Sequence, residues 1–577
     1  MRAEGGSAAQ EAERGAQVAS PPEPIIPPPG FEVVWEDPGD EKLFWTMDRM
    51  HSPDPVSPLA HTCLGPTFTP GLETANAFYG LPTSRRRSLR INTYVYGWAA
   101  PPSLPPADME AAFVAAKQRL DAVKTRLWEF WEQEVLSEVK ELLDRFDAFD
   151  LRGSSNDELL RHLDDAVAWM TRLWELHFRT VYPAYVAVAE LEEFYSDLFG
   201  TDDAFGAHRM VQGLGNMTVE TGRALWRLSR EAMGSPEVLD AIAEGSSEDV
   251  LGRLGETEAG ARFASLLDEY VQEFGQRGDK FEIDAVYWTE DPAPVIQGLR
   301  NYVALPGECD PSAELERLSR DRERAIEQTR SRLRTYPAAV REQFEESLKA
   351  AHAGVVITED HNFWIDCRGT WRLRRLLLEF GRRLAERGLI DGPRDVFLLE
   401  RDEMTAAVGR LPEGEDLRGL VRTRLEEMNR YARIRPPSAL GTPETQPRSR
   451  DNFMARTFGR FFGADVEQGD DGAVRGHPGS PGTAKGTARV INSIEEAGRL
   501  KPGDVLVATT TAAPWTPLFA TVSAVVTDTG GALSHCAVVA REYGIPAVVG
   551  TGTATTVIRD GQIVEVDGDA GVVRVSG

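Results

Sequence analysis

The stretch Thr527–Gly550 constrains the fold most, because it combines strand, loop and helix signals in a fixed order. An apolar run, Val522–Val526, predicts a buried strand, and the pair Gly530–Gly531 interrupts it. A short helix over Ser534–Tyr543 follows, with its first residue as N-cap and a glycine and a proline after its end. The next apolar segment, Ala547–Val549, predicts a second strand. Together these signals indicate a small α/β domain.

His535 lies in the first turn of that predicted helix, behind the glycine loop. Free backbone N–H groups and the helix dipole favour a phosphoryl group there. An imidazole is also a competent nucleophile and leaving group at neutral pH. Phosphoryl-binding hydroxyl and backbone donors are predicted at Thr527, Thr529, Gly530, Gly531 and Ser534. The alternative is a buried histidine with only a structural role.

The run Gly-Gly-Ala-Leu-Ser-His-Cys-Ala-Val-Val-Ala-Arg-Glu-Tyr-Gly-Ile-Pro-Ala-Val-Val-Gly at 530–550 resembles the phosphohistidine signature of the phosphoenolpyruvate-utilising enzymes. The similarity extends over Gly476–Val575 and includes Pro-Gly-Asp-Val-Leu-Val from Pro502. This family contains rifampicin phosphotransferase and the split phenylphosphate synthase and 4-cresol-phosphorylating systems. The resemblance implies a swivelling domain of β/β/α type in which His535 carries the phosphoryl group between two remote sites. Cys536 stands where the family more often has alanine.

Composition excludes several kinds of partner. The net charge of −27 argues against nucleic acid and anionic membranes, since both require a basic surface. No apolar run is long enough for a membrane span, and no signal-peptide core begins the chain. The 4 cysteines are scattered without CxxC spacing. We therefore expect a reduced, cytoplasmic protein without a metal site.

Four regions are expected along the chain. Residues 1–30 lack aromatic side chains and predict a disordered tail. Residues 31–435 predict a mainly α-helical substrate domain, residues 436–475 a Pro-, Gly- and Asp-rich linker or hinge, and residues 476–577 the swivelling domain.

Apolar spacing predicts most of the helices in the substrate domain. They are expected at Asp108–Phe149, Asn156–Phe199, Glu220–Met233, Pro236–Glu244, Glu258–Phe274 and, interrupted near Pro337, Ser312–Ala353. An aromatic stripe that includes Trp174, Phe178 and Tyr185 is expected in the bundle core, with part of it lining a pocket. His177 has no metal-ligand spacing and is interpreted as structural.

Two segments of the substrate domain carry candidate catalytic groups. Prolines hold the loop after Met47 extended, so that it presents Asp48, Arg49 and His51. Asp48 is a candidate base, and Arg49 and His51 are candidates for binding the substrate or the phosphoryl group. A surface turn fixed by proline is the alternative. The second segment runs from Thr358 to Arg375: Glu359, Asp360, His361 and Asp366 could supply a base, and Arg368 and Arg372 could hold a phosphoryl group. A surface network of ion pairs is the alternative.

Both segments resemble parts of rifampicin phosphotransferase-like proteins, the second through Glu-Asp-His-Asn-Phe-Trp-Ile-Asp at 359–366. The segment from Gly275 also resembles a Gly-His-Arg motif of these proteins, which implies a phosphoryl-binding role for Arg277. Gln276 replaces the usual histidine there.

The sequence contains neither a phosphate loop of the Walker type nor a recognisable ATP-grasp domain. We therefore expect ATP and Mg²⁺ to be bound by a separate ATP-grasp subunit that phosphorylates His535 and releases AMP and phosphate. The expected acceptor is the hydroxyl of a phenol or alkylphenol. Neither a nucleic acid nor a membrane is expected as a partner. The alternatives are an enzyme for an antibiotic or another alcohol, and a phosphocarrier or regulatory protein that has no small-molecule acceptor.

Overall fold

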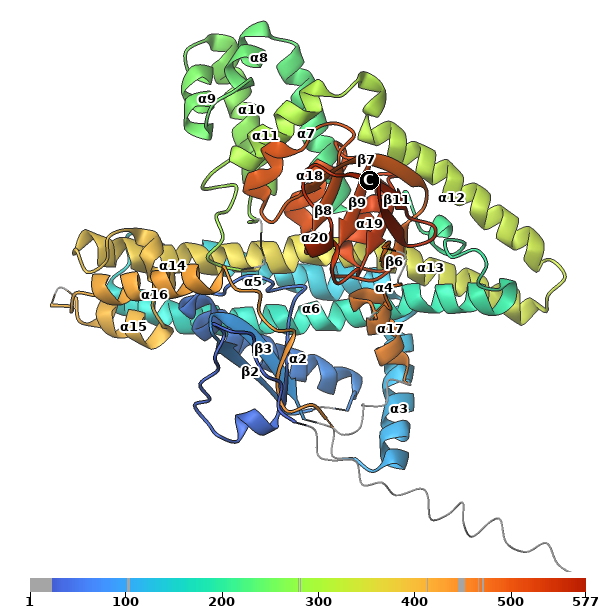
Figure 1. Cartoon of the computed structure of the whole chain (residues 1–577), viewed down its shortest axis with the longest axis horizontal. Helices are drawn as coiled ribbons and strands as arrows, with labels where there is room; N and C mark the ends of the chain where they lie inside the picture. The colour runs from blue at the N-terminus through green and yellow to red at the C-terminus, as the bar shows by residue number, and fades with distance from the viewer. Residues whose placement is uncertain are drawn as a thin grey trace, which may run out of the picture.

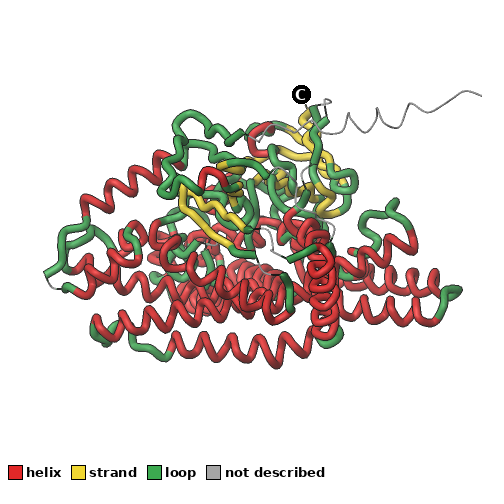
Figure 2. The backbone as a smooth tube through the Cα atoms, turned by 90° about the horizontal axis from the view of Figure 1, so that it is seen from below, coloured by secondary structure: helices red, strands yellow, loops and turns green. Residues whose placement is uncertain are grey.

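The computed structural model describes residues 23–82, 84–100, 104–278, 280, 282–411, 413–444, 452–464, 466–469 and 472–576. Long helices form its body, a small sheet packs on one side of them, and a β-rich C-terminal domain lies on the other (Figure 1). Figure 2 shows the helices as a broad layer with the C-terminal strands gathered on one side of it. These observations confirm a mainly helical region followed by a β-rich domain. Among the described residues, no helix has the length and apolar character needed to cross a membrane.

The helices up to the C-terminal domain have the following bounds. They are α2 (Gly65–Tyr79), α3 (Pro106–Lys124), α4 (Leu127–Glu129), α5 (Ser137–Asp147), α6 (Asn156–Phe199), α7 (Met217–Met233), α8 (Pro236–Ile242), α9 (Ser247–Leu254), α10 (Glu258–Phe274), α11 (Ala293–Ala304), α12 (Pro311–Leu333), α13 (Ala338–His361), α14 (Arg368–Glu386), α15 (Arg401–Gly409), α16 (Arg418–Tyr431) and α17 (Phe453–Phe462). The predicted bounds of α6 and α10 are confirmed, and the helices on either side of Pro337 are α12 and α13.

The prediction of one helix over Asp108–Phe149 is wrong. The chain turns after Lys124, and a new helical run begins at Leu127 and continues through a π-helical turn at Phe130–Leu136 into α5. The turn lets both parts reach α6, because Lys124 pairs with Glu190 near one end of α6 while α5 pairs with its first half. Apolar spacing alone carries no signal for such a turn.

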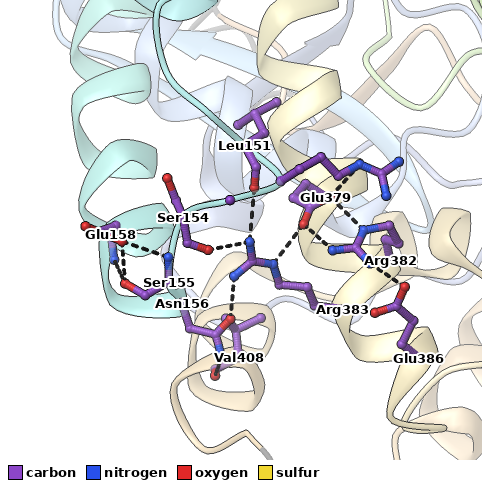
Figure 3. Close-up of polar contacts among 12 residues, drawn as sticks. Leu151, Ser154, Ser155, Asn156, Glu158, Glu379, Arg382, Arg383, Glu386 and Val408 are labelled. Atoms are coloured by element: carbon purple, nitrogen blue, oxygen red, sulfur yellow. Dashed lines mark hydrogen bonds and ion pairs between the residues drawn. The ribbon is translucent and has the colours of Figure 1, made fainter.

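The start of α6 is fixed by hydrogen bonds between neighbouring residues and by Arg383, which is distant in the sequence. Ser155 and Glu158 form a capping box. Arg383 of α14 donates to the carbonyl oxygens of Leu151 and Ser154 at 3.0 and 2.6 Å, and to Asn156 Oδ1 at 2.8 Å (Figure 3). These bonds hold the loop before α6 against α14.

A π-helical turn, Asn362–Cys367, joins α13 to α14 and lies in the segment that carries predicted catalytic residues. In an α-helix, positions i and i+5 point in different directions, whereas a π-helical turn brings them closer to one face. His361 and Asp366 are such a pair, with Nε2 and Oδ2 3.8 Å apart. Asn362 donates to Asp366 Oδ2 at 3.2 Å across the same turn.

The small sheet combines distant parts of the chain. Its strand order is β2 (Arg86–Ile91), β3 (Tyr94–Ala99), β1 (Phe44–Met47) and β4 (Ala439–Gly441). Both β4 and α17 lie within the predicted linker 436–475, so this segment contains regular structure. Its role as a hinge stays a prediction.

The C-terminal domain is an 8-stranded sheet with short helices. Its order is β5 (Val474–Arg475), β12 (Val572–Ser576), β11 (Ile563–Asp567), β7 (Thr483–Val490), β8 (Val505–Ala508), β9 (Ala524–Thr527), β10 (Ala547–Val549) and β6 (His477–Ser480). Its α-helices are α18 (Thr516–Phe519), α19 (His535–Glu542) and α20 (Ala554–Val557). The order β9, α19, β10 confirms the strand, helix and strand that the sequence predicts, and β9 and β10 are parallel.

The C-terminal domain packs directly on the helical body. One buried apolar cluster joins Leu225 and Leu299 of the body with Phe519 and Ala537 of the domain. Glu542 of α19 accepts a hydrogen bond from the backbone N–H of Gly213 at 3.0 Å. The structure therefore holds α19 against the helical body.

Close packing of α13 on α6 depends on Gly354. A Cβ atom at this residue would lie 2.7 Å from the carbonyl oxygen of Ala184. We expect Gly354→Ala to lower the free energy of unfolding by about 1–3 kcal/mol, because the two backbones must separate. The matched control is Gly252→Ala in α9, where a Cβ atom meets nothing within 4 Å. Thermal or urea unfolding of both variants measures the difference, and an equal effect at the two sites would contradict the packing argument.

Candidate functional site

His535 is the first residue of α19, and Ser534 is its N-cap residue, as the sequence predicts. The imidazole Nδ1 lies 2.8 Å from Oε2 of Glu359, which belongs to the last turn of α13. Because an ionised carboxylate only accepts hydrogen bonds, Nδ1 carries the proton in this contact. Nε2 is buried and has no hydrogen-bond partner among the described residues. With Nδ1 in contact with Glu359, Nε2 is the ring nitrogen that is left without a partner among the described residues.

The loop before α19 is held by α17. Gly530 has a φ of +100°, and a Cβ atom at Gly531 would lie 2.2 Å from the carbonyl oxygen of Arg460. The Gly531 N–H donates to Phe461 O at 2.8 Å. The pair of glycines is therefore required for the close approach of the loop to α17.

The hydroxyl groups predicted near His535 have two different environments. Thr527 and Thr529 donate to the carbonyl oxygens of Thr529 and Thr509, at 2.8 and 3.1 Å, and so hold the loop together. Ser534 makes no side-chain capping bond, and its hydroxyl is buried without a partner among the described residues. Only the Ser534 hydroxyl is thus left without a protein partner beside the histidine.

Glu359 is fixed from a second side. It is only 3% exposed, and its Oε2 also accepts a hydrogen bond of 2.8 Å from Thr218 Oγ1 of α7. Its neighbour Asp360 is directed to the start of α7, where it accepts the Met217 N–H at 2.7 Å. Burial raises the pKa of Asp360 to about 6. Glu359 is therefore the acidic residue of this segment that contacts His535.

His361 and Asp366 form a group with His177 of α6. His177 Nδ1 lies 2.8 Å from Asp366 Oδ1, and the two imidazole rings are 4.7 Å apart between centroids. Burial, followed by the nearby His177, lowers the pKa of His361 to about 4, so this imidazole is neutral. Tyr185 lies within the electrostatic influence of both Glu359 and Asp366. This places the histidine group close to the residue that holds His535.

Of the four arginines predicted to bind substrate or the phosphoryl group, Arg277 and Arg368 lie over the same ring, that of Phe363. Arg277 is 2% exposed, its guanidinium lies 5.2 Å from the ring centroid of Phe363, and its Nη1 has no hydrogen-bond partner among the described residues. Arg368 pairs with Glu273 at 2.9 Å. Arg372 binds Asp147 and the carbonyl oxygen of Leu143, and it donates to Gln276 Oε1 at 3.1 Å. Arg277 and Arg368 each keep one buried guanidinium nitrogen, Nη1 and Nε respectively, without a hydrogen-bond partner among the described residues.

The proline-rich loop after β1 contributes a histidine and a carboxylate. His51 Nδ1 lies 2.8 Å from Asp48 Oδ2, and the two side chains are 40% and 45% exposed. Burial acts to lower the pKa of His51, but the neighbouring Asp48 outweighs it and raises the pKa above the ordinary value, with smaller contributions from Asp366 and Glu282. Arg49 lies half-buried in the same loop. The structure thus combines both predicted segments at one site.

Sequence reasoning missed the roles of His177 and Glu282, and it named Glu359 as a candidate base but not as the partner of His535. His177 follows Met170 by seven residues, on the apolar stripe of α6, where a polar side chain requires a partner. That was the available signal. Glu282 accepts a 2.6 Å hydrogen bond from Ser52, and burial raises its pKa to about 7. The sequence around Glu282 gave no comparable signal.

Two parts of the chain match known families. Residues 177–359 match the rifampicin phosphotransferase fourth domain, and residues 500–571 match the mobile domain of PEP-utilising enzymes. The chain is 39% identical over 560 residues to chondramide synthase of Chondromyces crocatus, with 95% of this chain and 14% of that protein covered. It is 28% identical to an uncharacterized phosphotransferase of Bacillus subtilis, with 93% and 62% covered. It is 30% identical to the rifampicin phosphotransferase of Streptomyces sviceus, with 82% and 52% covered. The chain therefore spans less than two thirds of each of these relatives.

Proposed function

Because this chain belongs to the phosphoenolpyruvate-utilising enzymes and resembles rifampicin phosphotransferase, we propose that it transfers a phosphoryl group from His535 to an acceptor hydroxyl. The observation that carries the proposal is the contact between His535 Nδ1 and Glu359, which leaves a buried Nε2 without a partner among the described residues. The positive charge is assigned to Arg277, which is buried and on which the charge of Glu359 acts.

In this mechanism the phosphoryl group is carried on Nε2 of His535, while Glu359 accepts the hydrogen bond from Nδ1–H. The acceptor oxygen forms the new bond to phosphorus, the bond from phosphorus to Nε2 breaks, and its electron pair returns to Nε2. The ring then leaves as neutral imidazole, because Nδ1 keeps its proton. Arg277 offsets the negative charge on the transferring oxygens.

The acceptor proton goes to His51 in this proposal. Asp48 accepts from Nδ1 of His51, which orients the ring in the way that a carboxylate orients a catalytic histidine. A pKa above the ordinary value also suits a base that works near neutral pH. Being half-exposed, His51 can return the proton to water.

We propose a phenol or alkylphenol as the acceptor. Aromatic side chains lie beside two of the site histidines. Between ring centroids, Trp174 and Phe178 lie 5.3 and 4.8 Å from His177, and Phe462 lies 6.1 Å from His51. Such rings favour a flat aromatic substrate. ATP and Mg²⁺ are assigned to an ATP-grasp subunit that loads His535 and releases AMP and phosphate.

The test follows labelled phosphate through two separate steps. The full chain is loaded from ATP labelled at the β-phosphate with an ATP-grasp partner, freed of nucleotide, and mixed with phenols, alkylphenols and non-aromatic alcohols. We expect label on His535 first and then on the phenols. Label that moves only to non-aromatic alcohols would exclude the phenol, and label that stays on His535 with every acceptor would favour the phosphocarrier alternative. Absence of label from His535 would contradict the relay.

The dyad of His51 and Asp48 predicts a pH dependence of the second step. Protonated His51 cannot accept a proton, so transfer from loaded chain should fall as pH decreases through its raised pKa. Asp48→Asn removes the main group that raises this pKa and should move the fall to lower pH. His51→Asn should slow transfer by about 100-fold without preventing loading of His535. The control is His61→Asn, and a pH profile that is the same in wild type and Asp48→Asn would contradict this assignment.

A further inference from the structure

We propose that His177, His361 and Asp366 bind a divalent transition-metal ion, best represented by Zn²⁺, and that this ion binds the acceptor hydroxyl. One ligand atom from each residue lies within 4.8 Å of the others. The site deepens the proposed function, on which its catalytic role rests, although metal binding itself can be measured alone. No metal site was predicted from the sequence, because His177 has no metal-ligand spacing.

The geometry of the three side chains suits one small ion. Ligand atoms around an ion at about 2.0–2.2 Å lie roughly 3 Å apart. The distances in the protein are 2.8 Å from His177 Nδ1 to Asp366 Oδ1, and 3.8 Å from His361 Nε2 to Asp366 Oδ2. Small rotations of the side chains would therefore bring the three ligand atoms to one centre.

Neighbouring groups orient the ligands as they do in metal sites. His361 Nδ1 lies 3.0 Å from the carbonyl oxygen of Ile357, so Nδ1 is the donor and Nε2 presents its lone pair to the group. Asn362 donates to Asp366 Oδ2 at 3.2 Å. The side chains of His361 and Asp366 are 5% and 9% exposed.

The kinds of ligand decide the kind of ion. Two imidazoles and one carboxylate favour Zn²⁺ and similar transition metals over Mg²⁺ and Ca²⁺, which prefer oxygen ligands. Three protein ligands leave a coordination position open, as in catalytic zinc sites. An acceptor hydroxyl in that position would lose its proton more easily. This matters for a phenol, whose ordinary pKa is near 10.

The ion and His51 have complementary roles in this account. The ion weakens the acceptor O–H bond, His51 takes the proton, and the acceptor oxygen then bonds to the phosphorus on Nε2 of His535. The contact of His361 Nδ1 with the Ile357 carbonyl oxygen leaves Nε2 beside Asp366, which suits the role of a ligand.

The experiment measures metal binding and phosphoryl transfer separately. Chelator-treated full chain is titrated with Zn²⁺ by calorimetry, and its metal content after dialysis is measured by mass spectrometry; Co²⁺ gives an independent visible spectrum. We expect one equivalent of Zn²⁺ per chain, with binding weakened by about 100-fold or more in His177→Ala and in Asp366→Asn. His162→Gln, on the same helix as His177, should bind Zn²⁺ like wild type.

Two results would overturn the metal site: wild type without a stoichiometric Zn²⁺, or His177→Ala and Asp366→Asn with wild-type affinity. If one variant misfolds, as thermal unfolding would show, the wild-type stoichiometry and the other variant still decide. Failure of the proposed function looks different, because label would then not leave His535 even in Zn²⁺-loaded wild type. Transfer that is equally fast in metal-free and Zn²⁺-loaded wild type would overturn the catalytic role of the ion.

Discussion

His535→Asn is expected to abolish label on the chain and to lower phosphorylation of the acceptor by about 10⁴-fold or more. The relay places the whole reaction on one ring nitrogen, so its loss removes both steps and not only one. Asparagine keeps a polar side chain beside Glu359, which leaves the packing of α19 on the helical body largely unchanged. Labelling by the ATP-grasp partner and transfer to a phenol are measured on the same sample.

His477→Asn is the matched control, because it changes another histidine of the C-terminal domain. His477 Nε2 contacts the backbone of Ala464 at 2.8 Å and has no place in the proposed reaction. This variant should keep its label. A His535→Asn chain that is labelled as strongly as wild type would exclude His535 as the carrier and favour a structural histidine.

The sequence predicted those parts of the molecule that short-range signals determine. Glycines, an N-cap residue and apolar runs located β9, α19 and β10, and therefore also His535. Apolar spacing located α6 and α10, because a helix that packs along its whole length repeats the same pattern. The same spacing did not predict the end of α3 at Lys124, where the chain turns and Lys124 pairs with Glu190 of α6.

The site itself depends on contacts between segments that are far apart in the chain. Asp366 pairs with His177 across 189 residues, and a π-helical turn, which no spacing rule predicted, directs it there. Arg368 and Arg372 were predicted to hold a phosphoryl group, but they pair with Glu273 and Asp147. A charge pattern on a helix thus indicates that the charged residues form ion pairs, but it does not identify the residues with which they pair.

Glu359→Gln is expected to slow transfer from loaded His535 to the acceptor by about 10³-fold, while loading of His535 stays close to wild type. The carboxylate holds the proton on Nδ1 at 2.8 Å, and this leaves Nε2 free to carry the phosphoryl group. An amide can present its N–H₂ group to Nδ1 and so favour the ring with its proton on Nε2, as happens when the aspartate of a catalytic triad is changed to asparagine. Loading is spared because, in the proposed cycle, the C-terminal domain leaves Glu359 to reach the ATP-grasp subunit.

Single-turnover chase of label from loaded chain to phenol measures the second step, and the rate of labelling measures the first. Glu220→Gln is the control: Glu220 lies on α7 near Thr218 but pairs with Arg223 and Arg227 on the surface. An equal loss in both steps would mean that Glu359 is needed for folding and has no specific role when the C-terminal domain lies against the helical body. An unchanged transfer rate would mean that the contact between Glu359 and His535 is not the arrangement from which the phosphoryl group is transferred.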